Sequence, residues 1–437
     1  MTGRRVAQGM ANCKQQELWS LRHPGAGSSL SMQYAGIGVI VSMAFLICVG
    51  IAMISSATIS DSGTHFFKMQ LVWAGAGTVL CLAGAFMPLD WFYRHSHWGM
   101  VAVFIPLLYL TIAAVSVKFA GSGTIRFFPC AAAIKGAVRW LRFGPIQVQP
   151  SEFAKVALVL FLAAYYGNLP RERIKAFGAG VAAPVGPAVA VLGLVVLGKD
   201  LSTSVVIGVM ILAIIFLAGV RFRYVLIFIL AGAILGSAFI LSSPMRMNRI
   251  TAWRYPAETR EGESYQLFRS QICLGVGSVT GTGYSKGYMK TYLPEPHTDF
   301  IVAVIGEEFG FVGMMVLLLT YFLMCGCIVA IASQCRRRED LLLCYGVAIL
   351  ILVQALVNVS VVSGWIPPTG ITAPFLSYGG SSLISLMFLI GLVMNVLQRN
   401  LHDIWQEECS QSHVIPIAHG TNYNPPKNLS NGGDKDE

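Results

Sequence analysis

The sequence predicts an all-α membrane protein with about ten transmembrane helices. Hydrophobic residues make up 55% of its 437 positions, charged residues make up only 12%, and the mean hydropathy is +0.64. Soluble globular chains carry about twice that charged fraction, so the composition excludes a water-soluble enzyme and a disordered protein. A spanning helix needs roughly 20 apolar residues. The predicted spans are 34–55, 67–88, 98–118, 152–167, 176–197, 201–219, 223–242, 300–333, 341–364 and 372–398.

Basic residues in the short connections predict the orientation of these spans, because Lys and Arg gather in short cytoplasmic loops. The short outer connections, around 56–66 and 364–371, have no Lys or Arg. We therefore expect a cytoplasmic segment at 1–33, a transmembrane domain at 34–398 and a flexible cytoplasmic tail at 399–437. The connections assigned to the cytoplasm contain Arg94, Arg171, Arg173, Lys175, Arg221, Arg223, Arg336, Arg337 and Arg338.

Two longer connections on the outer side, 119–151 and 243–299, are also rich in Lys and Arg. The second is a large extracytoplasmic loop between the seventh and eighth helices. With the formal net charge of +10, they indicate either a solvated surface beside lipid headgroups or a site for an anionic substrate. Nucleic acid is disfavoured as a partner, because basic residues beside spans more often set topology or contact membrane lipid. Cys130 and Cys273 lie in or near these loops and are the candidates for a disulfide.

The segment YLPEPHTDF, at 292–300, precedes the eighth span. Its two prolines disfavour helix in the residues before them. The helix is therefore expected to begin near Thr298, with Asp299 in its first turn at the outer membrane surface. One interpretation of Asp299 is structural, because an acid at a helix start caps free N–H groups and interacts favourably with the helix dipole. The other interpretation is chemical.

Neighbouring ionisable side chains favour the chemical interpretation. Glu295, His297 and Asp299 fall within one short stretch beside the membrane, and Glu307 and Glu308 follow two turns further along. Ionisable groups at such depth are expensive and usually functional. Alternatively, the histidine and the carboxylates are the ligands of a divalent metal, although such close spacing is a weak signature of a metal site.

A second group of charged residues precedes and opens the fourth span. Arg139 lies in RWLRFGP, and QPSEFAK follows at 149–155. The Pro-Ser pair predicts a helix start, which places Glu152 and Lys155 three residues apart on one helix face. In water such a pair is an ordinary ion pair worth about 0.2–0.5 kcal/mol. At the mouth of a membrane bundle we favour the interpretation that the pair lines a cavity.

The segment GITAPFLSYGGSS, at 370–382, opens the last span with a proline and a Gly-Gly pair. Such interruptions are tolerated in a membrane only where protein or a water-filled cavity satisfies the freed backbone groups. Close helix packing by small residues is the alternative. Asp200, just before the sixth span, either caps a helix or faces the cavity. The residues assigned to substrate binding in the Gly-Gly segment are Ser377, Tyr378, Gly379 and Gly380.

The segments KGAVRWLRFGPIQVQPSEFAK, YLPEPHTDFIVAVIGEEFG and GITAPFLSYGGSSL resemble, in this order, the signature regions of the SEDS family (shape, elongation, division and sporulation). The similarity runs from about residue 34 to 400 and is greater to the FtsW and sporulation branch than to the RodA branch. The chain departs from the family in KDLST at 199–203, in a longer basic stretch before Lys135, and in the spacing of Lys286 and Lys290 ahead of YLPE.

The resemblance implies an enzyme of the bacterial inner membrane that polymerises lipid II, the undecaprenyl-pyrophosphate-linked disaccharide pentapeptide, into peptidoglycan during cell division. It implies a class B penicillin-binding protein, a transpeptidase, and other divisome proteins as partners. The family's essential aspartate matches Asp299, and its Glu and Lys match Glu152 and Lys155. Asp299 is then the general base on the GlcNAc 4-hydroxyl, which attacks the MurNAc anomeric carbon with inversion and releases undecaprenyl pyrophosphate.

Further expectations and alternatives follow from the same residues. Arg139, Glu295 and His297 are expected to join the substrate-binding set, and no cofactor is required, with Mg or Mn as an optional cation. The sequence has no Walker loop and no HExxH motif, which disfavours nucleotide-driven transport and zinc proteolysis. The alternatives are a lipid II flippase or other lipid transporter, a RodA-type elongation polymerase and a non-catalytic scaffold. A transporter is expected to have acids near the midplane, whereas the acids here cluster at one face.

Overall fold

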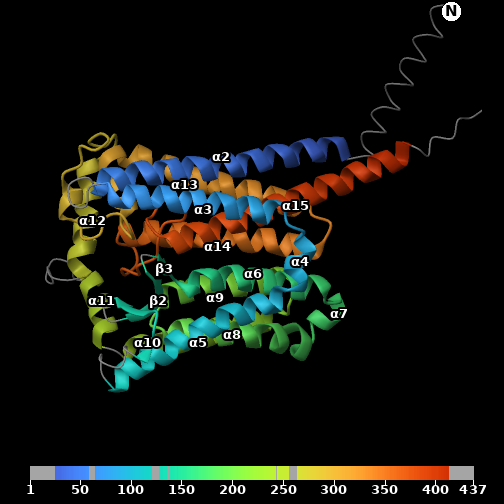
Figure 1. The fold of residues 1–437 in the computed structure, drawn as a ribbon, viewed down its shortest axis with the longest axis horizontal. Helices are drawn as coiled ribbons and strands as arrows, with labels where there is room; N and C mark the ends of the chain where they lie inside the picture. The colour runs from blue at the N-terminus through green and yellow to red at the C-terminus, as the bar shows by residue number, and fades with distance from the viewer. Residues whose placement is uncertain are drawn as a thin grey trace, which may run out of the picture.

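The computed structural model describes residues 25–58, 64–120, 127–134, 137–144, 146–242, 244–254 and 263–412. In this part of the chain ten long helices run side by side, and they form the bundle seen in Figure 1. These helices are α2 (Gly25–Thr58), α3 (His65–Phe86), α5 (Ser96–Ala120), α6 (Pro150–Asn168), α8 (Ala183–Leu197), α9 (Leu201–Leu217), α10 (Phe222–Leu241), α13 (Ile301–Ser333), α14 (Arg338–Val362) and α15 (Gly380–Ser412).

Each long helix overlaps one of the ten predicted spans, so the prediction of an all-α polytopic membrane protein is confirmed. Eight helices among the described residues are long and apolar enough to cross a membrane. Helix α9 is shorter, with 17 residues, and α6 contains the charged pair Glu152 and Lys155. On α10 only 6% of the most apolar stretch is buried inside the protein. Such a surface needs lipid to cover it, because monomeric soluble proteins rarely expose large contiguous apolar patches.

The connection at 243–299, predicted as a loop, contains helices that cross one end of the bundle (Figure 1). Helix α12 packs against α13 and α14, with Leu267, Ser270 and Cys273 buried. The hydroxyl of Ser270 donates to the carbonyl of Val362, at the end of α14, over 3.2 Å. Burial of this face explains why the segment is ordered. The elements of the connection are α11 (Pro244–Arg254), α12 (Glu263–Gly277) and the 3₁₀ turn η3 (Met289–Tyr292).

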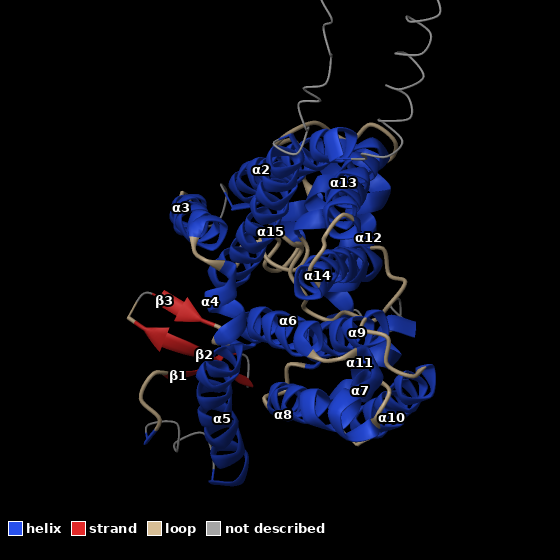
Figure 2. Ribbon diagram, turned by 90° about the vertical axis from the view of Figure 1, so that its right-hand side faces the viewer, coloured by secondary structure: helices blue, strands red, loops and turns tan. Residues whose placement is uncertain are grey.

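The connection at 119–151 also contains regular structure, which the prediction of a loop missed. Its three short strands form an antiparallel sheet with the order β1-β2-β3 (Figure 2). Val138 of the central strand is 3% exposed and packs with Leu110 and Ala113 of α5. The sheet is therefore anchored to the bundle. The strands are β1 (Ala131–Ile134), β2 (Ala137–Phe143) and β3 (Ile146–Val148).

The last span differs from its predicted bounds of 372–398. Residues 363–379 are not helical, and α15 then continues to Ser412. The helix extends into the predicted flexible tail because its face remains buried there, with Asn400 and Ile404 at 2% and 8% exposure. The rest of the predicted tail, 413–437, and residues 1–24 of the predicted N-terminal segment lie outside the described residues.

Helix α13 is interrupted at Gly310, which has φ 63° and ψ −159°. The N–H groups of the two residues after it donate to carbonyls of the 278–283 segment, at 2.9 and 3.1 Å. The helix carbonyls left without these donors, those of Glu307 and Glu308, accept N–H groups of the same segment at 3.0 and 2.9 Å. A Cβ at Gly310 would lie 2.4 Å from the backbone nitrogen of Gly281, so the close approach requires glycine.

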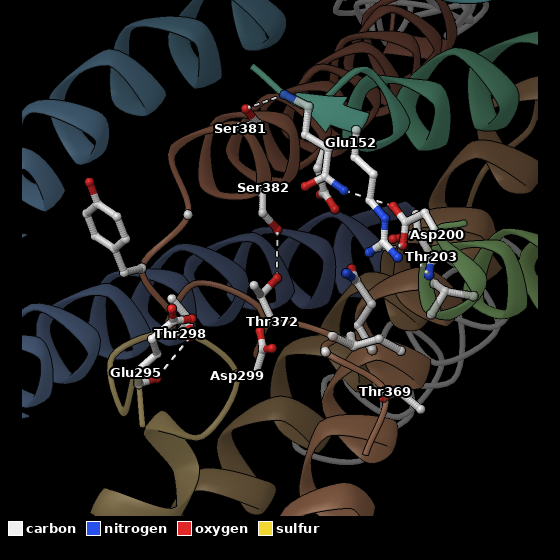
Figure 3. A pocket seen from close by; sticks show the side chains of 18 of the residues that line it. Glu152, Asp200, Thr203, Glu295, Thr298, Asp299, Thr369, Thr372, Ser381 and Ser382 are labelled. Atoms are coloured by element: carbon white, nitrogen blue, oxygen red, sulfur yellow. Dashed lines mark hydrogen bonds and ion pairs between the residues drawn. The ribbon is translucent and has the colours of Figure 1, made fainter. Parts of the chain in front are cut away.

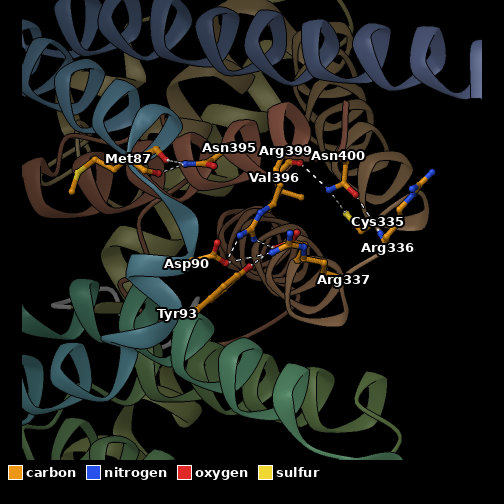
Figure 4. Close-up of polar contacts among 12 residues, drawn as sticks. Met87, Asp90, Tyr93, Cys335, Arg336, Arg337, Asn395, Val396, Arg399 and Asn400 are labelled. Atoms are coloured by element: carbon orange, nitrogen blue, oxygen red, sulfur yellow. Dashed lines mark hydrogen bonds and ion pairs between the residues drawn. The ribbon is translucent and has the colours of Figure 1, made fainter. Parts of the chain in front are cut away.

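Polar side chains join α4 (Leu89–Arg94), α14 and α15 at the other end of the bundle (Figure 4). Arg399 donates to Asp90 and, over 3.4 Å, to Asp340, which also accepts from the hydroxyl of Tyr93 at 2.8 Å. The hydrogen bond from Arg399 and its charge hold the pKa of Asp90 below its usual value. The described chain begins and ends at this same end, opposite α11 and α12 (Figure 1).

The disulfide that the sequence left open, between Cys130 and Cys273, is not formed. Both cysteines are free, and Cys130 is exposed whereas Cys273 is buried within α12. Burial, together with the neighbouring Glu307 carboxylate, raises the pKa of the Cys273 thiol to about 12. A thiol with such a pKa stays protonated and unreactive at neutral pH.

Candidate active site

A cavity of about 380 Å³ lies at the end of the bundle that α11 and α12 cover (Figure 3). This volume is within the range of roughly 300–1,000 Å³ that is typical of small-molecule sites. Its walls come from all three segments singled out in the sequence, together with α9, α11, α12 and α14. The sequence-predicted residues that line it are Arg139, Glu152, Asp200, Glu295, Asp299, Tyr378 and Gly379.

Asp299 lies in a turn just before α13 and not in its first helical turn. The helix begins at Ile301, three residues later than predicted, because the N–H of Thr298 closes a turn on the carbonyl of Glu295 at 3.2 Å. Glu295 itself has φ 51°, a conformation that few residues other than glycine adopt. The N-cap position of the helix belongs to Phe300, so Asp299 lies one residue before it. The half-buried carboxyl of Asp299 faces the cavity, and a Cβ on Gly370 would lie 3.2 Å from its Oδ2.

Two contacts hold the backbone around Asp299. The side-chain amide of Asn358, on α14, donates to the carbonyl of Asp299 at 2.9 Å and to that of Ile371 at 2.7 Å. The N–H of Tyr378 donates to the carbonyl of His297 at 2.8 Å. The turn that carries the carboxylate is therefore fastened to the non-helical segment before α15.

Glu152 and Lys155 form the predicted ion pair on α6. Lys155 Nζ lies 2.7 Å from Glu152 Oε2, and the two side chains are 1% and 7% exposed. Glu152 faces the cavity, whereas Lys155 does not line it. The cation therefore compensates the carboxylate from inside the protein, and the free face of the carboxylate is available to a ligand.

Asp200 both caps a helix and faces the cavity, the two alternatives that the sequence left open. Its Oδ1 accepts from the N–H of Thr203 at 3.4 Å and so caps α9, and its side chain lines the cavity. Its Oδ2 accepts from Gln149 Nε2 at 2.8 Å and from the hydroxyl of Ser151 at 3.1 Å. Arg139, on β2, lies 3.8 Å from its Oδ1. The sheet therefore supplies a guanidinium to the cavity wall.

Three other predicted residues do not line the cavity. The hydroxyl of Ser377 is buried and accepts a backbone N–H four residues earlier, at 2.8 Å. Gly380 packs against the ring of Trp73, where a Cβ would approach to 2.4 Å. His297 stacks on Phe66, with ring centroids 4.2 Å apart. These residues shape the segments around the cavity, and their assignment to substrate binding remains a prediction.

Several polar residues of the cavity were not assigned from the sequence. Gln354 and its neighbour one turn on, Asn358, lie inside an apolar span, and a buried amide in a membrane helix is the signal that should have found them. Arg249 lies on α11. Its segment was expected to be a loop, and a predicted loop does not indicate which way a side chain points. The unassigned polar side chains of the cavity wall are Gln149, Thr203, Arg249, Gln266, Thr298, Gln354, Thr369, Thr372, Ser381 and Ser382.

The described residues do not form a metal site on their own, since no three His, Cys, Asp or Glu side chains among them converge. Magnesium is usually held by one or two carboxylates together with substrate phosphates. Binding of a Mg or Mn ion therefore stays an expectation that concerns the substrate complex.

Comparison with known proteins places these features in a family. The family model for FtsW, RodA and SpoVE proteins, described as "Cell cycle protein", matches residues 31–402. The probable peptidoglycan glycosyltransferase FtsW of Trichlorobacter lovleyi is 33% identical over 358 residues, which cover 79% of this chain and 89% of that protein. Stage V sporulation protein E of Bacillus subtilis is 32% identical over 369 residues, which cover 82% and 95%.

Two solved structures are similar to the whole bundle. A chain from a study of the structural coordination of polymerization and crosslinking by a peptidoglycan synthase complex has a TM-score of 0.67 and 26% identity, and the match covers 83% of this chain and 97% of that one. The rod shape determining protein RodA of Thermus thermophilus has a TM-score of 0.61 and 26% identity, with coverages of 83% and 96%.

Proposed function

Since this chain belongs to the FtsW, RodA and SpoVE family, we propose that it is a peptidoglycan glycosyltransferase that polymerises lipid II. One observation carries the proposal. A half-buried carboxylate, Asp299, is fastened by its backbone on the wall of a cavity that also contains two arginines, Arg139 and Arg249. A base beside cationic side chains is what glycosyl transfer from a pyrophosphate donor needs.

The proposed reaction uses these residues in sequence. Asp299 takes the proton from the GlcNAc 4-hydroxyl of one substrate as its oxygen attacks the MurNAc anomeric carbon of the other. The bond from that carbon to the pyrophosphate oxygen breaks, with inversion, and undecaprenyl pyrophosphate leaves. Arg139 and Arg249 stabilise the negative charge that grows on the pyrophosphate. Glu152 accepts hydrogen bonds from the sugar or peptide portion of the substrate.

The distribution of polar groups favours an enzyme over a transporter. A transporter exposes its site to both sides in turn and places charged groups near the midplane. The cavity here lies at one end of the bundle. Asp90 and Arg399, which form polar contacts at the other end, do not line it.

We propose a bacterial inner-membrane location, a role in cell division and a class B penicillin-binding protein as partner. The similarity to a chain of a peptidoglycan synthase complex supports such a partner. The basic residues beside α4 and α7 (Arg171–Ile174), at the end where the described chain begins and ends, support cytoplasmic termini.

Cysteine labelling tests this orientation. In a variant without reactive native cysteines, a cysteine placed near Glu263 is expected to react with a membrane-impermeant reagent added to intact cells. A cysteine placed at Arg337 is expected to react only after the membrane is opened, because the two positions lie at opposite ends of the bundle. The reverse pattern would overturn both the orientation and the proposed site of chemistry.

The proposed activity is tested with purified protein and labelled lipid II, alone and with its cognate transpeptidase. We expect glycan strands to form and undecaprenyl pyrophosphate to be released. If labelled lipid II instead crosses vesicle membranes without forming polymer, the protein is a flippase and the proposal fails.

A further inference from the structure

A group of buried charged side chains lies outside the cavity, between η3, α2 and α13. Lys290, Glu307 and Glu308 are 5%, 0% and 1% exposed, and Ser56 of α2 is 1% exposed. None of these residues lines the cavity. Buried charges in a membrane protein are costly and call for a function.

The geometry of the group is specific. Lys290 Nζ lies 2.5 Å from Glu308 Oε1 and donates to the hydroxyl of Ser56 at 2.6 Å, and that hydroxyl donates to the same carboxylate oxygen at 2.5 Å. The carboxylate of Glu307 accepts the backbone N–H groups of Met289 and Lys290 at 2.7 and 2.9 Å. One lysine is therefore held by both its backbone and its side chain.

These contacts join the two ends of the segment that contains Asp299. Lys290 and Glu308 are 18 residues apart in the sequence, and Asp299 lies midway, nine residues from each (299 − 290 = 308 − 299 = 9). Glu307 and Glu308 also come just before the break in α13, where their carbonyls bond to the 278–283 segment. Both ends of the loop are thus fixed to one point of the bundle.

We propose that Lys290 and Glu308 are positioning residues that set the place of Asp299 in the cavity, an inference that rests on the proposed function of Asp299 as the base. A buried ion pair is a poor device for stability alone, because a hydrophobic pair of similar size often stabilises as well or better. The ion pair instead fixes the relative position of the two segments that it joins, since charge-assisted hydrogen bonds have specific geometry. Small displacements of a reacting group cost about 100-fold in rate.

The test compares variants of the full-length protein in the lipid II polymerisation assay. Lys290→Gln is expected to lower kcat about 100-fold while changing KM for lipid II less than about twofold, because the cavity wall that binds substrate is untouched. Lys290→Arg, which keeps the charge and the donors, is expected to recover part of kcat. Lys286→Gln is the matched control, since it removes the same charge from an exposed side chain of the same segment, and it is expected to leave kcat unchanged.

A second pair of variants separates position from folding. Asp340→Asn disturbs a buried polar contact at the opposite end and is expected to lower Tm without lowering kcat at a permissive temperature. If Lys290→Gln fails to fold, the double variant Lys290→Met with Glu308→Met removes the unpaired charge and is expected to fold but to keep the low kcat.

The outcomes distinguish this proposal from the one on which it rests. Full activity of Lys290→Gln, or of the double variant, overturns the positioning role, whereas a dead Asp299→Asn enzyme in the same series leaves the proposed function standing. An active Asp299→Asn enzyme overturns the proposed function itself.

Discussion

Replacing Asp299 by asparagine is expected to lower the rate of glycan polymerisation by at least about 100-fold, because removal of a general base typically costs 10²–10⁴-fold. The substitution preserves size. It also preserves the backbone carbonyl that accepts from Asn358, so the turn before α13 keeps its attachment. The measurement is the initial rate of polymer formation from labelled lipid II by protein purified at matched concentration.

Thermal unfolding of the Asp299→Asn variant provides the control. Its Tm is expected to stay close to that of the unmodified protein, since the carboxyl is only half-buried and the substitution preserves its size. Polymerisation at a near-normal rate would remove Asp299 from the mechanism. A large fall in Tm would show instead that the carboxylate is structural.

Replacing Lys155 by methionine is expected to destabilise the protein by about 3–5 kcal/mol, because it leaves the Glu152 carboxylate buried without its cation. Polymerisation is expected to fall with it. The double variant Glu152→Gln with Lys155→Met is expected to regain most of the lost stability, since no charge is left unpaired. It is expected to remain inactive, because Glu152 is the member of the pair that faces the cavity. Thermal unfolding and the polymerisation assay measure the two effects separately.

The charge swap Glu152→Lys with Lys155→Glu makes the same distinction in another way. It keeps an ion pair at the same two positions of α6 but presents a cation to the cavity, so activity is expected to stay low. Recovery of polymerisation in the swapped protein would mean that the pair serves only the structure.

Much of the fold was predictable because each span is a local pattern. Ten apolar segments gave ten helices, and the three-residue spacing of Glu152 and Lys155 gave their ion pair, since both follow from helix periodicity alone. The start of α6 at Pro150 followed from its Pro-Ser signal in the same way. The prediction of function came from three motifs. No local pattern implies that these motifs meet in one cavity.

The missed features depend on tertiary contacts. Asn358 bonds to the carbonyls of two segments, and nothing in its own helix predicts these partners. Arg139 reaches the cavity wall because it lies on a strand of a small sheet, which its sequence did not signal. Ser377 stands in the conspicuous Gly-Gly segment, yet its hydroxyl closes a local turn. The motifs indicated that these segments matter, but they did not indicate which of their other side chains line the cavity.

The break in α13 has a consequence for biosynthesis. Around Gly310 the backbone bonds of the helix are completed by residues 278–283, which the ribosome makes earlier than the helix itself. Unpaired backbone groups are not tolerated in hydrocarbon, so α13 reaches its final form only when that preceding segment lies alongside it. The segment that completes the hydrogen bonds is therefore synthesised before α13, which needs them. A chain circularly permuted between residues 283 and 301 would reverse this order, and the eighth span would then emerge without its hydrogen-bond partners.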